Sequence, residues 1–146
     1  MTGGGEMDFK RLLRRFNNLR RRRLAPQARS QPTPDVTADD VDRIVRRDFP
    51  NEQFAPITAL LNEYGHEKWH RESSRVRLAV LKLAHGSVEK LRVHIEAAKG
   101  DYRDVLAAAE YPDYCKIGFR ITELPADEQR RIINRDWKQY EDWLRK

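Results

Sequence analysis

The sequence is poor in cysteine and in long apolar runs, and both shortages exclude classes of protein. Cys115 is the single cysteine among 146 residues, so neither an internal disulfide nor a cysteine-based zinc finger can form. No apolar run reaches the roughly 20 residues that cross a bilayer, and the first ten residues lack the apolar stretch of a secretory signal. We therefore expect a cytoplasmic protein without a transmembrane segment, in which Cys115 is buried or inert.

Most enzyme signatures are also missing. No glycine-rich phosphate loop follows a strand pattern, and no GxSxG nucleophile elbow occurs. Apolar residues make up 39% and charged residues 36% of the chain, a composition that permits a folded domain with a modest core. The length indicates one such domain, which we place at residues 37–146.

Positive charge is concentrated at the start of the chain. Residues 1–36 contain nine Lys or Arg and three acidic residues, whereas residues 37–146 contain 20 of each sign. The net charge of +6 therefore belongs to the first quarter, and only this arm attracts anions over long range. The remainder is neutral.

Residues 7–24 are predicted to form a basic amphipathic helix, and residues 25–36, with three prolines, an extended linker. The arginines of this predicted helix are candidates for binding nucleic-acid phosphates or another anionic partner: Arg11, Arg14, Arg15, Arg20, Arg21, Arg22 and Arg23. Phe9, Leu13 and Phe16 form an apolar stripe that suits a groove on a protein partner or an anionic membrane surface. A solubilising tail, or a helix that packs back on the body, explains the same pattern.

The body is predicted to be all-α, because its apolar residues recur at helical spacing between capping and stop signals. The expected helices run from Thr37 to Pro50, Asn51 to Gly65, Ser73 or Ser74 to Gly86, Ser87 to Gly100, Asp101 to Pro112, and from Pro125 onward. The third should be the most buried. Residues 113–122 are expected to form a loop or a short extended piece. Short connections favour an antiparallel helical bundle or a short stack of helical hairpins.

Aromatic side chains gather on the final helix. Trp137 and Tyr140 lie on its apolar stripe with Ile133 and are expected in the core. Trp143 lies at the margin of that stripe and is the candidate for a protein interface, where tryptophan is enriched.

The segment from Tyr64 to Pro112, in particular RVRLAVLKLAHG and DYRDVLAAAEYP, resembles a group of small uncharacterised bacterial all-α proteins and, more loosely, the helical hairpins of HEAT-like repeats. The resemblance covers about a third of the chain. It implies helices and carries no activity, cofactor or site residue with it.

One catalytic pattern occurs, the HExxH string of His66, Glu67 and His70. On a helix it would place two imidazoles around zinc with Glu67 as general base. A zinc site needs a third ligand, and the nearest downstream candidates, His85, Glu89 and His94, do not stand in the extended zincin spacing. The string also falls in a connection between two predicted helices. We therefore prefer an interpretation in which Trp69 fills the core and both histidines are surface groups, with no cofactor.

The sequence favours a non-enzymatic helical interaction module that binds a protein partner and whose arginine-rich arm docks to acidic surfaces. A nucleic-acid-associated protein that uses the arm for phosphate contacts is the alternative. A small zinc hydrolase built on His66, Glu67 and His70 is the third hypothesis.

Overall fold

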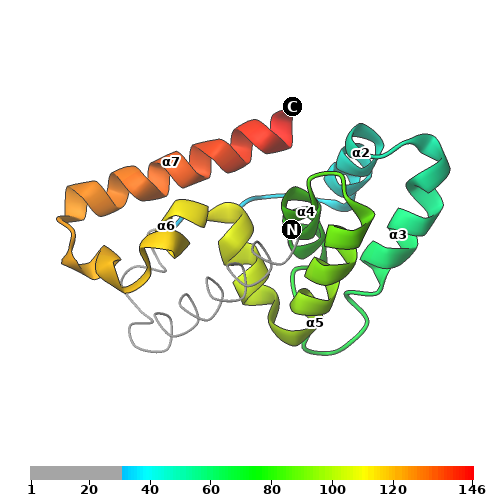
Figure 1. The fold of residues 1–146 in the computed structure, drawn as a ribbon, viewed down its shortest axis with the longest axis horizontal. Coiled ribbons are helices and arrows are strands. Elements are labelled where there is room, and N and C mark those ends of the chain that lie inside the picture. Colours follow the sequence, from blue (N-terminus) through cyan, green and yellow to red (C-terminus); the bar gives the residue numbers. More distant parts are fainter. Residues whose placement is uncertain (1–30) are drawn as a thin grey trace, which may run out of the picture. The chain divides into compact units, whose positions relative to one another are not determined.

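The computed structural model describes residues 31–146 (Figure 1), which form six α-helices, two short 3-10 helices and no strand. The predicted all-α class is confirmed. The predicted helix at residues 7–24, with all the arm residues named above, lies outside the described residues. The described chain divides into two compact units: residues 34–109, and residues 31–33 with 110–146. The single domain expected for residues 37–146 stays a prediction.

The unit of residues 34–109 begins with α2 (Ala38–Asp48). The Asp40 carboxylate accepts the backbone N–H of Thr37 at 2.9 Å, as in a capping box that satisfies donors at a helix start. Val41, Ile44 and Val45 are buried along one face. The helix ends just before Pro50, which confirms the predicted start and stop of this helix.

A 3-10 turn, η1 (Asn51–Gln53), leads into α3 (Phe54–Asn62). Asn51 therefore opens the 3-10 turn rather than capping α3, which corrects the predicted start of this helix. Both α3 and α4 (Ser73–Ala84) pack against α2. Six of the twelve residues of α4 are buried, so this helix supplies much of the core, as predicted.

The residues that flank α4 at both ends adopt the left-handed backbone conformation. Glu72 takes the N-cap position with φ of 51°, and His85 takes the C-cap position with φ of 49°. Ser73 is already the first helical residue, so the prediction that a serine caps α4 is wrong. Residues other than glycine pay a steric cost in this conformation. The Glu72 carboxylate accepts two hydrogen bonds of 3.0 Å from Arg75, which help to hold the residue there.

The long helix α5 (Val88–Glu110) is broken at Asp101, whose backbone has φ of −149° and ψ of 99°. Asp101 accepts the backbone N–H of Arg103 at 3.1 Å and binds its guanidinium at 2.9 Å. A carboxylate in this position caps the segment that follows. The predicted division into two helices at Gly100 and Asp101 is confirmed.

The second unit contains α6 (Pro112–Ile117), η2 (Gly118–Glu123) and α7 (Ala126–Arg145), with α6 packed on α7 (Figure 1). The prediction of a loop or extended piece at residues 113–122 is therefore wrong. Pro112 ends the preceding helix and also occupies the first turn of α6. A backbone N–H at that position would have no partner within the helix, so proline is tolerated there. Pro125 is the N-cap residue of α7, whose first helical residue is Ala126. The helix therefore begins one residue later than predicted.

The core of this unit includes Ile121, Ile133 and Tyr140, and Cys115 is 1% exposed, which confirms the buried cysteine. Trp137 and Trp143 are both half-buried. Trp137 is thus less enclosed than predicted. The ring of Trp143 lies 5.6 Å from that of Tyr140. No helix among residues 31–146 is long and apolar enough to cross a membrane.

Candidate interaction site

The HExxH string lies in the connection of residues 63–72 between α3 and α4 (Figure 1), as predicted. His66 and Glu67 are exposed and His70 is half-buried. Because the string is not helical, the two histidines do not occupy successive turns of one helix, which is the arrangement that a zincin requires. In the described part of the chain, no three His, Cys, Asp or Glu side chains are grouped to hold a metal ion.

The imidazole of His70 organises this connection from within. Its Nδ1 atom accepts the backbone N–H groups of Gly65 at 3.0 Å and Glu67 at 3.4 Å. The ring also stacks on Tyr64, with centroids 4.4 Å apart and planes 19° from parallel. In the neutral ring the proton therefore resides on Nε2. His70 is a structural residue of the loop.

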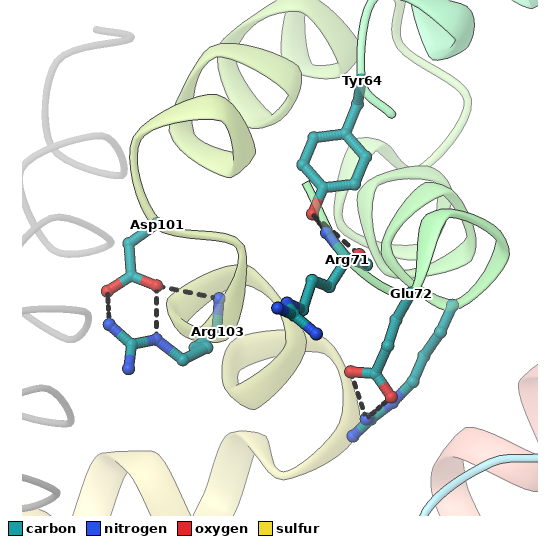
Figure 2. A network of polar contacts seen from close by, with 6 residues as sticks. Tyr64, Arg71, Glu72, Asp101 and Arg103 are labelled. Atoms are coloured by element: carbon teal, nitrogen blue, oxygen red, sulfur yellow. Dashed lines mark hydrogen bonds and ion pairs between the residues drawn. The ribbon is translucent and has the colours of Figure 1, made fainter. Parts of the chain in front are cut away.

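The hydroxyl of Tyr64 closes the same loop (Figure 2). It donates to the carbonyl of Arg71 at 2.8 Å and accepts the N–H of Arg71 at 3.0 Å. Tyr64 is fully buried, and burial is the main cause that raises the pKa of its hydroxyl to about 12. The hydroxyl consequently keeps the proton that its bond to the Arg71 carbonyl requires.

Two further contacts fix the start of the loop. Arg77 on α4 donates to the carbonyls of Leu61 at 3.0 Å and Tyr64 at 2.7 Å, which ties the last turn of α3 and the first residue of the loop to α4. Gly65 has φ of 118°, and a Cβ there would stand 2.9 Å from the Ser73 hydroxyl oxygen. Glycine is therefore required both by the backbone angle and by the space.

Trp69 is 62% exposed at this loop, so the prediction that it fills the core is wrong. Tyr64, and not Trp69, is the aromatic residue of this segment that is fully buried. The indole meets the His70 ring edge-on, with centroids 5.8 Å apart. A large aromatic side chain is thus displayed on a loop whose backbone is held by Tyr64, His70 and Arg77. We call residues 64–72 the Trp69 loop.

Only part of this site could be found in the sequence. The HExxH motif points to His66, Glu67 and His70, whereas no sequence pattern gives Tyr64 or Arg77 a role in this loop. Their partners are backbone atoms of irregular segments, which periodicity does not locate. The available signal was Gly65, since a glycine followed by an irregular segment marks a tight turn.

The other predicted site residues are placed as follows. Trp143, the predicted interface residue of α7, is half-buried, and its ring contacts that of Tyr140. Residues Phe9, Leu13, Phe16 and the seven arginines of the arm lie outside the described residues. No family model, characterised protein or solved structure matches the chain.

Proposed function

We propose that the chain is a non-enzymatic interaction module whose Trp69 loop binds a protein partner and whose arginine-rich arm docks to an acidic surface. The observation that carries the proposal is the exposure of Trp69 on a loop with a fixed backbone. Tryptophan is among the residues that contribute most to protein interfaces. A side chain presented on an ordered loop loses little conformational entropy on binding.

The surroundings of Trp69 suit an interface with a polar rim. Glu67 and Lys68 are exposed beside it, and they carry opposite charges. Such a rim excludes water from the central contact and adds little affinity itself. The same geometry argues against the zinc hydrolase hypothesis. Nδ1 of His70 accepts two backbone amides within the loop, so the proton of the neutral ring lies on Nε2 and that nitrogen has no lone pair for zinc.

A quantitative pulldown with the full chain tests the proposal. Trp69→Ala should abolish the capture of a specific set of proteins, whereas Val93→Ala, which removes another exposed apolar side chain of the same unit, should leave that set unchanged. Replacing Arg20, Arg21, Arg22 and Arg23 by Gln should weaken capture without changing its specificity. Identical captures by all variants would refute the proposal.

Nucleic-acid binding by the arm is the second candidate, favoured by the net charge of +6 in residues 1–36. Contacts to phosphates release counterions, so such binding would fall steeply between low and moderate salt. The four-arginine variant should lose it, and Trp69→Ala should not. Binding that is absent or indifferent to salt would eliminate this candidate.

A further inference from the structure

The unit of residues 110–146 has an open groove of about 900 Å³ between α6 with η2 on one side and the first half of α7 on the other. It lies apart in sequence from the Trp69 loop. Four cationic side chains line it: Lys116, Arg120, Arg131 and Arg135. Glu128 is the acidic residue among its lining residues.

This local excess of positive charge is not a property of the whole unit. Residues 110–146 contain eight basic and eight acidic residues, so the unit is neutral. Acidic side chains elsewhere on α7 are engaged with other cations: Asp127 with Arg130 at 3.9 Å, and Glu141 with Arg145 at 3.9 Å. These two acidic residues of α7 thus contact cations that do not line the groove.

The cations of the groove are also available. Within residues 31–146, Lys116, Arg120 and Arg131 are exposed and make no ion pair. Arg135 contacts Asp113 at 3.3 Å, but its side chain remains 67% exposed. An exposed pair of this kind is weak and exchanges readily for another carboxylate.

Between these charges the groove is aliphatic. Ile117, Leu124 and Ile132 line it, and among the residues that the structure describes its lining includes no aromatic ring on which a base could stack. The α7 residues of the lining, 128, 131, 132 and 135, follow the spacing of one helical face. Aliphatic contacts bordered by arginines match a peptide helix that carries apolar and acidic side chains.

We propose that this groove binds an acidic amphipathic helix of a protein partner, with carboxylates on Arg120 and Arg131 and apolar side chains over Ile117, Leu124 and Ile132. The chain's own basic arm has the wrong charge for the groove. The groove shares no residue with the Trp69 loop, so this proposal and the proposed function of the loop are tested separately.

The proposal is tested by fluorescence anisotropy with the full chain. The probe is a labelled peptide of about 16 residues with Leu at i, i+3, i+4 and i+7 and mostly Glu elsewhere. The double variant Arg120→Gln/Arg131→Gln should weaken its binding by about tenfold or more. Arg130→Gln is the matched control, because Arg130 is a neighbouring exposed cation of α7 that does not line the groove, and it should change binding by less than about twofold.

A second peptide of the same composition, with its leucines dispersed around the helix, separates this groove from attraction to the basic arm. It should bind at least about tenfold more weakly to the unaltered chain. Equal binding of both peptides, unchanged binding by the double variant, or no binding at all would overturn the proposal. Displacement of the peptide by mixed-sequence RNA in the unaltered chain, but not in the double variant, would assign the groove to nucleic acid instead. Self-association lost in the double variant would assign it to a second copy.

Discussion

Asp136, from the middle of α7, caps the first turn of α6 by accepting the backbone N–H of Tyr114 at 2.9 Å. The other oxygen of the carboxylate accepts the N–H of Asp113 at 3.1 Å. Because Pro112 has no N–H, this one side chain satisfies two of the amide donors left open at the start of α6. Asp136 is fully buried, so the helix that replaces the expected loop depends on a carboxylate 22 residues away.

The buried Asp136 should make the stability of the protein fall as the pH rises from about 4 to 6. Burial is the main cause that raises its pKa from 3.8 to about 6, against the lowering effect of its two amide bonds. The folded state therefore holds the proton more tightly than the unfolded state, and its contribution is complete only below the unfolded pKa. The effect is on the order of 3 kcal/mol, since one pKa unit corresponds to about 1.4 kcal/mol.

Urea unfolding of Asp136→Asn at pH 4 and pH 7 checks this. Relative to the unaltered chain, the variant should gain stability between these values, because it carries no titrating charge. Asp127→Asn, in the exposed first turn of the same helix, should show no comparable gain. A difference between variant and unaltered chain that is constant with pH would contradict the account.

His94 should have the opposite effect. Burial, with smaller contributions from His85 and Lys90, lowers the pKa of its imidazole from 6.5 to about 4. The folded state thus resists protonation, so stability is complete above pH 6.5 and is lost as the pH falls toward 4. His94→Gln should remove this loss, up to about 3 kcal/mol, while the exposed His66→Gln should not. Unfolding free energies at pH 4.5 and 7 decide between these outcomes.

The fold class and most helix boundaries of the body follow from local signals. Thr37 with Asp40, the proline after α2, and the pair Gly100 and Asp101 each act within a few residues of the boundary they set. Residues 113–122 were mispredicted for the opposite reason. Their β-forming side chains suggest extended structure, whereas the helical turn is stabilised by Asp136, a contact that no local pattern contains.

Removing the Tyr64 hydroxyl should loosen the Trp69 loop without unfolding the unit. Tyr64→Phe leaves the N–H and carbonyl of Arg71 without that partner, at a cost of about 1–3 kcal/mol. Amide hydrogen exchange should accelerate at His70 and Arg71, and acrylamide should quench the Trp69 fluorescence more readily. Tyr102→Phe, at a half-buried tyrosine of α5, is the control. Unchanged exchange at Arg71 would show that the loop is held by other contacts.

Two glycine substitutions should change stability in opposite directions. Gly65→Ala combines a backbone φ of 118° with a Cβ 2.9 Å from the Ser73 oxygen, and it should destabilise by at least about 1 kcal/mol. Gly100→Ala meets nothing within 4 Å and should stabilise by up to about 1 kcal/mol, because alanine favours helix. Thermal or urea unfolding of both variants provides the measurement. A stable Gly65→Ala would exclude the close packing of the loop against α4.

The candidate site shows the same limit of sequence patterns as α6. The HExxH string is a real feature of the sequence, but the side chain of His70 binds backbone amides of its own loop instead of joining His66 on a helix face. Trp69 was expected in the core. Tyr64 is buried there instead, and only the three-dimensional path of residues 64–72 reveals that the indole is exposed.

Site-specific photo-crosslinking in cells tests the central claim most directly. A photoreactive residue in place of Lys68, beside Trp69, should give one or a few discrete protein adducts that disappear when Trp69 is also replaced by Ala. The same group at Lys90, an exposed position on α5 of the same unit, should not give these adducts. If position 68 yields no adduct, or the same adducts as position 90, the Trp69 loop is not a binding site for a protein partner.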